Sequence, residues 1–185
     1  MRDVFLSGPA GVGKDTVASV LASKYEFARM AFADPMKDLI MRINPQISTD
    51  RLAERVAALG WDEAKTHPEV RRLLQETGMA CRDLFGAEFW IRQLALRMAY
   101  TPLPVVVTDM RMENEFDFAV DDGAVVVRLS RPGVDTGVGW RSHASERDLD
   151  AISDDEFDLV ISGDWSPESA AASIVRFIEL EDTGD

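Results

Sequence analysis

The chain has 185 residues, a formal net charge of −13, 46% hydrophobic residues and one cysteine, Cys81. It is long enough for one domain with a substantial core and too short for two ordinary ones, and its acidic balance argues against polymeric nucleic acid, which is bound through many Lys and Arg side chains. Because no apolar stretch approaches the roughly 20 residues of a membrane helix, no signal peptide is visible and one cysteine allows no internal disulfide, we expect a cytoplasmic protein.

A glycine-rich loop follows the first predicted strand, residues 4–6, and precedes a predicted helix; it reads G-P-A-G-V-G-K-D-T over residues 8–16. In this context the G-x-x-x-x-G-K spacing predicts a nucleotide-phosphate site, because glycines let backbone N–H groups face phosphate oxygens and Lys14 can reach the outer phosphates. Asp15 takes the usual Ser/Thr place and the hydroxyl comes next, at Thr16, an order more like nucleotide monophosphate kinases than GTPases. A turn that merely needs glycines would leave Lys14 and Thr16 unexplained.

A second strand is predicted over residues 27–33, followed by a helix with Asp34 as its N-cap and Pro35 at its first position. Capping alone would explain Asp34. Lys37 comes one turn later, beyond the carboxyl end of the strand. An anionic ligand explains this lysine better than capping does.

Residues 44–100 form a predicted helical insertion, interrupted at Pro45, Gly60, Pro68, Gly78 and Gly86. Most arginines of this insertion are expected to face solvent and to contribute only to solubility. A set on successive turns, on either side of the Gly78 break, is the exception: Arg71, Gln75, Gly78 and Arg82. Trp90 fits either helix packing or a base-stacking platform, and His67 is predicted to cap a helix.

The apolar run of residues 104–108 predicts a buried parallel strand that ends in a carboxylate, Asp109. Carboxylates in this position of phosphate-loop proteins usually orient magnesium or its water ligands. Residues 110–115 follow as a dense polar cluster at the start of another helix. A capping turn would need only one of these polar groups.

A mobile loop is predicted after the strand of residues 124–129, because residues 133–143 are rich in glycine. Arg131 and Arg141 bracket the glycine-bearing stretch of residues 132–140, and such a loop can close over nucleotides and bring guanidinium groups to the transferring phosphoryl. We therefore predict a lid over residues 131–147. The alternative is an exposed loop whose arginines offset the acidic surface, and His143 is assigned a structural or hydrogen-bonding role.

The last strand is predicted over residues 157–161, and Ser166 with Pro167 starts the final helix. Taken together, the motifs make the chain resemble the deoxynucleoside monophosphate kinases of tailed bacteriophages. The segments that carry this resemblance are G-K-D-T at 13–16, F-A-D-P-M-K at 32–37, Arg71 with Leu74-Gln75 and Gly78, Phe89-Trp90, D-M-R at 109–111 with Asn114-Glu115, and His143 with Ser145-Glu146.

The resemblance implies an α/β P-loop kinase fold in one domain: a parallel sheet flanked by helices, with a helical acceptor-binding insertion. It also implies a homodimer that transfers the ATP γ-phosphoryl group to a deoxynucleoside 5′-monophosphate with Mg²⁺. Related proteins often carry Gly-Thr-Glu where this chain has Gly78-Met79-Ala80. Fewer polar groups are then available to the acceptor, which leaves the base preference open.

The candidate residues fall into four groups. ATP phosphates would be held by Gly11, Val12, Gly13, Lys14, Asp15 and Thr16. The acceptor would be surrounded by Asp34, Lys37, Arg71, Gln75, Gly78, Arg82, Trp90, Asp109, Arg111 and Glu115. The candidate magnesium ligands are Asp15, Thr16 and Asp109, and the candidate catalytic residues are Lys14, Arg131 and Arg141.

Three other functions are alternatives to a deoxynucleoside monophosphate kinase. A GTP-binding switch would need an Asn-Lys-x-Asp guanine clamp, which the sequence lacks. An inactive nucleotide-binding interaction module is disfavoured because Lys14, Asp109, Arg111 and Arg131 are all present. A kinase for another small phosphorylated metabolite, such as dephospho-coenzyme A or phosphomevalonate, would share the loop and fold and stays open.

Overall fold

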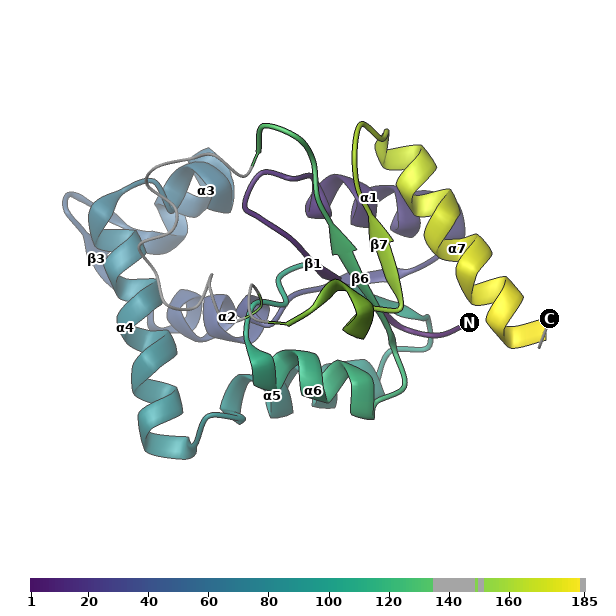
Figure 1. Ribbon diagram of the computed structural model, residues 1–185. Coiled ribbons are helices and arrows are strands. Elements are labelled where there is room, and N and C mark those ends of the chain that lie inside the picture. Colours follow the sequence, from purple (N-terminus) through teal and green to yellow (C-terminus); the bar gives the residue numbers. More distant parts are fainter. Residues whose placement is uncertain (135–148, 150–151, 184–185) are drawn as a thin grey trace. The chain divides into compact units, whose positions relative to one another are not determined.

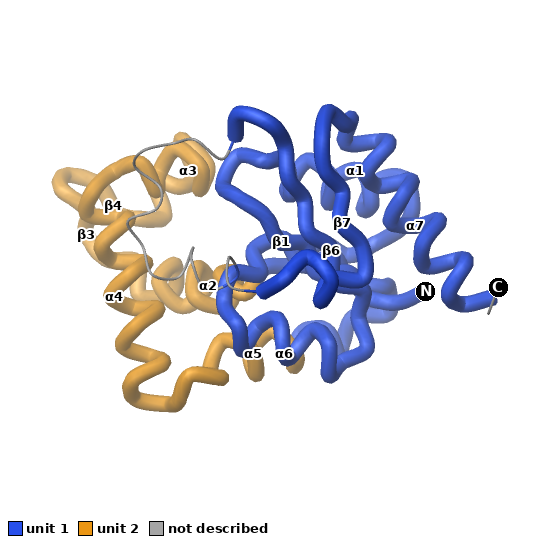
Figure 2. Tube along the Cα trace, viewed as in Figure 1, with its two compact units in different colours: residues 1–31, 97–185 blue, residues 32–96 orange. Residues whose placement is uncertain are grey.

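The structure is a computed structural model that describes residues 1–134, 149 and 152–183. The chain divides into two compact units, which we call unit 1 (residues 1–31 and 97–185) and unit 2 (residues 32–96) (Figure 2). Within the described residues, no helix combines the length and the apolar character needed to cross a bilayer.

Unit 1 is built on a five-stranded sheet in the order β2-β5-β1-β6-β7, with all neighbouring strands parallel (Figure 1). The strands are β1 (Val4–Ser7), β2 (Ala28–Met30), β5 (Val105–Val107), β6 (Val125–Leu129) and β7 (Leu159–Ile161). β1 and β5 are buried at every position, as expected for unbroken apolar runs in a parallel sheet covered on both faces. The predicted α/β class and parallel sheet are confirmed.

Side chains of β1 alternate between the two faces of this sheet. Val4 and Leu6 join a core with helices α1 (Lys14–Tyr25) and α7 (Pro167–Thr183). Phe5, between them, meets Phe118 of α6 (Glu113–Asp121) edge to face, with the ring centroids 5.9 Å apart. Helices therefore cover both faces of the central strand, which holds the loop after β1 on a rigid support.

The start of β1 is tied to its neighbours by Asp3. Its carboxylate accepts a hydrogen bond from the Val105 N–H at 2.6 Å, and its backbone carbonyl accepts one from the Val125 N–H at 2.8 Å. Burial raises the pKa of Asp3 above its usual value. These contacts lie at the opposite end of β1 from the glycine-rich loop.

Unit 2 is mainly helical, with a small core of Ile40, Ile47, Leu52 and Val70. Its elements are α2 (Ala33–Ile43), β3 (Gln46–Ile47), β4 (Asp50–Arg51), α3 (Leu52–Ala64), α4 (Pro68–Phe85) and α5 (Phe89–Ala99), the last of which crosses the unit boundary. The antiparallel β3–β4 pair was not predicted, since residues 44–100 were expected to be helical. It is two residues long on each side and leaves no periodic pattern.

Two local predictions in unit 2 are wrong. Gly78 does not break a helix, because α4 continues through it; Met36 of α2 packs so closely there that a Cβ on Gly78 would lie 3.3 Å from its sulfur. Tertiary packing thus outweighs the cost of about 1 kcal/mol for a helical glycine. Asp34 is not an N-cap, because α2 begins at Ala33 with Phe32 as its cap, and Asp34 pairs instead with Lys37 at 3.3 Å.

Three other signals are confirmed. Gly60 interrupts α3 with a φ of 74°. The His67 side chain caps α4 by accepting a hydrogen bond from the Glu69 N–H at 3.3 Å. The Ser166 hydroxyl accepts one from the Ser169 N–H at 3.1 Å at the start of α7. Short-range capping patterns therefore survive in the folded chain where no longer-range contact competes.

Candidate phosphate-binding site

The phosphate loop, residues 8–13, joins β1 to α1. Its turn is closed by a hydrogen bond from the Val12 N–H to the Pro9 carbonyl at 3.2 Å, and the Val12 side chain is buried in the core of unit 1. Gly13 caps α1, because its carbonyl accepts hydrogen bonds from the N–H groups of Thr16 and Val17 at 3.0 and 2.9 Å. The loop is therefore anchored at its middle and at its end.

Two glycines of this loop are required by geometry. Gly8 has a φ of 138°, and a Cβ there would lie 2.2 Å from the carbonyl oxygen of Leu129, the last residue of β6. Gly13 has a φ of 111°, a conformation that other residues rarely adopt. These are the two glycines of the G-x-x-x-x-G-K pattern, so close approach of β6 and the entry into α1 explain their spacing.

Lys14 opens α1, and its side chain is 9% exposed. Its ammonium group donates hydrogen bonds to the carbonyl oxygens of Gly8 at 2.5 Å and Pro9 at 3.1 Å. The cation therefore lies against the loop itself. Because an ammonium has three donors on a flexible stem, it can exchange carbonyl oxygens for phosphate oxygens without moving the backbone.

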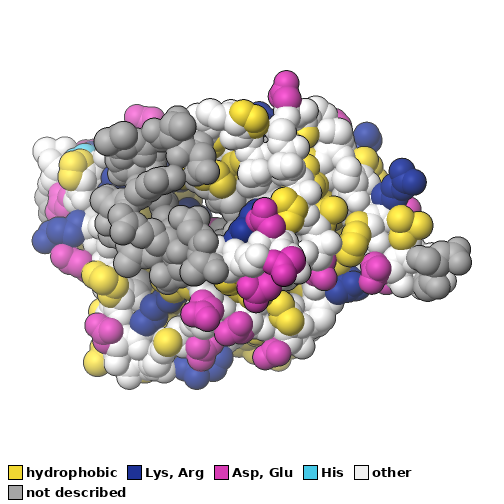
Figure 3. All heavy atoms as spheres, in the orientation of Figure 1, with side chains coloured by type: hydrophobic (Ala, Val, Ile, Leu, Met, Phe, Trp, Pro, Cys, Tyr) yellow, Lys and Arg dark blue, Asp and Glu magenta, His cyan; other side chains and the backbone are white. Residues whose placement is uncertain are grey.

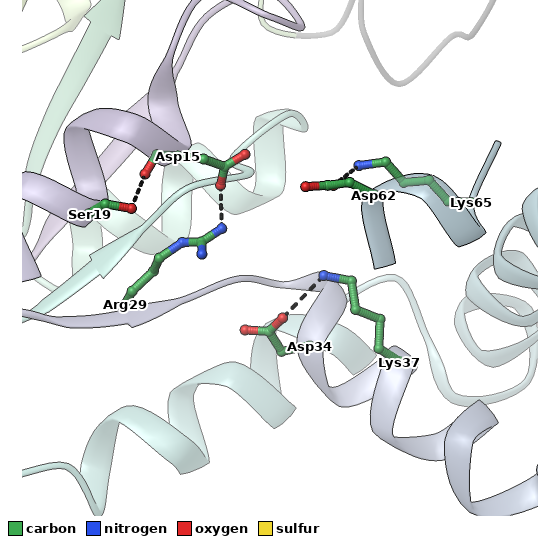
Figure 4. Close-up of polar contacts among 7 residues, drawn as sticks. All are labelled: Asp15, Ser19, Arg29, Asp34, Lys37, Asp62 and Lys65. Carbon is green, nitrogen blue, oxygen red and sulfur yellow. Dashed lines mark hydrogen bonds and ion pairs between the residues drawn. The ribbon is translucent and has the colours of Figure 1, made fainter. Parts of the chain in front are cut away.

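Asp15, the residue in the usual Ser/Thr place, pairs with Arg29 of β2. The Arg29 Nη2 and Asp15 Oδ1 atoms lie 2.5 Å apart, and the Ser19 hydroxyl donates to the Asp15 carbonyl oxygen at 2.8 Å (Figure 4). Sequence reasoning did not identify Arg29. The available signal was a charged residue inside an otherwise apolar predicted strand.

Magnesium in kinase sites is usually held by one or two carboxylates together with substrate phosphates. Among the described residues, no group of three or more His, Cys, Asp and Glu side chains is placed to hold a metal ion by itself. Thr16 and Asp109 fit the sparser arrangement, as a hydroxyl in the first turn of α1 and a half-buried carboxylate two residues beyond β5. The Asp15 carboxylate fits it less well because Arg29 already engages it.

Asp109 and Arg131 follow the two strands that flank β1. In a parallel sheet the carboxyl ends of all strands meet at one edge, where open α/β sheets bind their ligands. β5 and β6 both pair with β1, and Asp109 and Arg131 each come two residues after their strand ends. The topology thus brings a carboxylate and a guanidinium to the sheet edge that carries the phosphate loop.

The Glu115 side chain accepts hydrogen bonds from the backbone, a structural role that the sequence did not reveal. Its side chain is 3% exposed, and its Oε2 accepts hydrogen bonds from the N–H groups of Arg111 at 2.8 Å and Met112 at 3.2 Å. Glu115 therefore caps the start of α6. The Arg111 side chain is exposed, and acceptor binding by either residue stays a prediction.

Arg131 packs against Trp165, which lies in the connection between β7 and α7. Its guanidinium carbon is 4.3 Å from the centre of the indole ring, and its Nη2 donates to the Trp165 carbonyl at 2.6 Å. Its Nε is buried without a hydrogen-bond partner among the described residues. Arg141, its predicted partner in the lid, lies outside the described residues, as does His143.

The predicted acceptor residues of unit 2 lie on three helices. Arg71, Gln75, Gly78 and Arg82 recur along one side of α4, as their spacing of four, three and four residues requires. Lys37 and Asp34 form the ion pair of α2 drawn in Figure 4. Arg71 is exposed, whereas Gln75 and Arg82 are half-buried.

Trp90 of α5 is 4% exposed, and its indole N–H donates to the Gly78 carbonyl at 3.1 Å. Phe89 meets the same ring edge to face, with the centroids 4.7 Å apart. Trp90 and Gly78 thus join α4 to α5, while Gly78 also admits Met36 of α2. This is the helix-packing role that the sequence left open, and contact with an acceptor stays a prediction.

Comparisons with known proteins place these features in context. The "Putative deoxynucleotide monophosphate kinase" of Acanthamoeba polyphaga mimivirus is 26% identical over 200 residues, which span 94% of this chain and 94% of that protein. This match confirms the resemblance drawn from the motifs. No protein-family model matches the chain.

Solved kinase structures align over most of the chain at lower identity. A sugar kinase from Janibacter sp. gives a TM-score of 0.49 at 18% identity and covers 97% of this chain and 95% of its own. Shikimate kinase from Aquifex aeolicus gives 0.48 at 16%, with 99% of both chains covered, and Mycobacterium tuberculosis APS kinase gives 0.47 at 16%, with 96% and 97% covered. The parallel strand order and the glycine geometry of the phosphate loop are the features of this chain that support a P-loop fold.

Proposed function

We propose that the protein is an ATP-dependent deoxynucleoside monophosphate kinase, which transfers the γ-phosphoryl group of ATP to a dNMP and yields dNDP and ADP. The observation that carries the proposal is the phosphate loop, with Gly8 and Gly13 in conformations suited to glycine and the Lys14 ammonium held against its carbonyls. The mimivirus relative, matched over nearly the whole of both chains, supports this acceptor class.

Phosphoryl transfer between two polyanions depends on positioning and charge rather than on acid–base catalysis. In this proposal the phosphate loop holds the ATP phosphates, and Lys14 lowers the free energy of the charge that develops on the γ-phosphoryl oxygens. The acceptor phosphate is already ionised at neutral pH. No strong general base is therefore needed to activate it.

We assign Thr16 and Asp109 to Mg²⁺, which when bound supplies positive charge to the ATP phosphates. Asp15 is assigned a different role, that of an ion-pair partner that keeps Arg29 near the first turn of α1. The acceptor is assigned to the polar side chains of α2 and α4 in unit 2. A homodimer and a cytoplasmic location complete the proposal.

A kinase for another small phosphorylated metabolite remains the second candidate, since it would use the same loop. The test is an ATP-consumption screen in which purified protein and Mg²⁺ are given the four dNMPs, the matched ribonucleotides, dephospho-coenzyme A and phosphomevalonate. We expect at least one dNMP to be phosphorylated with a higher kcat/KM than its ribose counterpart. Turnover of a non-nucleotide alone would overturn the acceptor assignment, and equal kcat/KM for the two sugars would remove the deoxyribose preference.

A further inference from the structure

Trp165 lies in the connection between β7 and α7, directly before the Ser166 cap. Its side chain is 9% exposed and belongs to the core of unit 1, together with Val12 of the phosphate loop and Leu129 of β6. The proposed mechanism does not use this residue. Three segments that are distant in the sequence nevertheless meet at its indole ring.

The ring borders Gly13. A Cβ placed on Gly13 would lie 3.5 Å from Cη2 and 3.8 Å from Cζ3 of the Trp165 ring. Gly13 has no side chain that could fix its position, and its φ of 111° is open to few other residues. The indole edge therefore borders this end of the phosphate loop at a distance that leaves room for no more than about a methyl group.

The same residue holds the chain just beyond β6. The indole N–H donates to the Ser130 carbonyl at 2.9 Å. Arg131 stacks over the ring at 4.3 Å and donates to the Trp165 carbonyl at 2.6 Å. A planar guanidinium on an aromatic face, fixed by a hydrogen bond, has a defined orientation.

We infer that Trp165 is a positioning residue for nucleotide binding, whose indole limits the movement of Gly13 in the phosphate loop and orients the Arg131 guanidinium. Binding groups must be held within about 0.5 Å of their working geometry, and side chains packed behind them provide this constraint. The inference rests on the proposed function only in taking ATP as the ligand. A tryptophan that merely filled the core would affect stability and leave the ATP affinity of the folded protein unchanged.

The test compares two substitutions of Trp165 by calorimetric titration with Mg²⁺–ATP in the absence of any acceptor. Trp165→Leu keeps an apolar side chain but removes the flat ring, so we expect the Kd for ATP to rise about ten-fold or more. Trp165→Phe keeps an aromatic ring and loses the N–H, so we expect a Kd within about three-fold of the wild type. Ile178→Ala is the control, because Ile178 is fully buried in the same core on α7.

Ile178→Ala should lower the melting temperature but leave the Kd for ATP unchanged. Wild-type affinity in folded Trp165→Leu would overturn the inference, and so would an equal loss of affinity in Ile178→Ala. If Trp165→Leu does not fold, fluorescence decides the question: ATP should change the tryptophan emission of the wild type in a way that Trp165→Phe lacks, and identical changes would contradict the inference. A protein that binds ATP through Trp165 but phosphorylates no dNMP would refute the proposed function alone.

Discussion

Lys14 and Arg131 are two cations that donate hydrogen bonds to backbone carbonyl groups. Lys14 donates to Gly8 and Pro9, and Arg131 donates to Trp165. These hydrogen bonds hold the ammonium and the guanidinium in place against the backbone. We expect both cations to serve phosphate oxygens in the proposed reaction, whereas Arg128 is engaged by the Asp154 carboxylate at 2.5 Å.

Replacing Lys14 with Ala should leave the fold intact and lower kcat by on the order of a thousand-fold, because a cation that stabilises the transition state is lost. The measurement is steady-state turnover, with circular dichroism to establish folding. Lys24→Ala is the matched control, since Lys24 lies exposed in the last turn of the same helix. Near-normal turnover in folded Lys14→Ala would remove the central role given to the loop.

Arg131→Ala should lower kcat by roughly ten-fold or more and change the Kd for ATP by less than about three-fold, because a guanidinium that serves the transferring phosphoryl group acts mainly in the reacting complex. Arg176→Ala, which removes an exposed arginine of α7, should change neither value. Single-turnover kinetics and ATP titration separate the two effects. An unchanged kcat in Arg131→Ala would leave this residue as a structural partner of Trp165.

Among the elements, the connection from β1 through the phosphate loop to α1 is the part that sequence specifies best. Its apolar strand, paired glycines and lysine lie within eleven residues, residues 4–14, so a local pattern contains the whole feature. β5 and β6 were likewise predicted from their valine runs. Local patterns succeed here because burial and turn geometry act on consecutive residues.

Features that depend on distant contacts could not be predicted in this way. Arg29 meets Asp15 across 14 positions and Trp165 meets Ser130 across 35, so neither pair leaves a periodic signal. The predicted break at Gly78 was wrong for the same reason, because packing of Met36 of α2 decides that position. The predicted cap at Asp34 was wrong for a local reason, because α2 already begins at Ala33 and Asp34 pairs with Lys37 within the same helix.

The loop geometry predicts unequal effects for two glycine substitutions. Gly8→Ala should destabilise the fold by about 3 kcal/mol or more, because its Cβ would clash with the Leu129 carbonyl 2.2 Å away. Gly11 also has a positive φ, of 81°, but a Cβ there would meet no atom within 4 Å. We therefore expect Gly11→Ala to lower the free energy of unfolding by about 1 kcal/mol. Urea denaturation measures both, and equal losses would contradict the close approach of β6.

The substitution Asp109→Asn tests whether the carboxylate that follows β5 serves Mg²⁺. Loss of the carboxylate should raise the Mg²⁺ concentration needed for half-maximal activity by roughly ten-fold or more, because a metal ligand or the partner of a bound water is weakened. Asp117→Asn, on the exposed side of α6, is the charge-matched control. If Asp109→Asn keeps both its activity and its Mg²⁺ requirement, the metal assignment has to be dropped.

For the whole molecule, the relevant property is a net charge of −13 combined with a site for phosphates. Asp and Glu side chains are spread over the face drawn in Figure 3. Such a surface repels polymeric nucleic acid, whereas a small nucleotide needs only the local cations of its site, because salt screens more distant charges beyond about 8 Å. The protein should therefore act on free nucleotides and not on nucleotide ends within a polymer.

The most direct test follows the phosphoryl group itself. Purified protein is incubated with Mg²⁺, ATP labelled in its γ-phosphoryl group and a dNMP, and the products are separated by chromatography, with Lys14→Ala run in parallel. We expect the label in the β-position of the dNDP in the wild type and almost none there in Lys14→Ala. Label released only as inorganic phosphate, or transferred equally well by Lys14→Ala, would contradict the assignment of this protein as a deoxynucleoside monophosphate kinase.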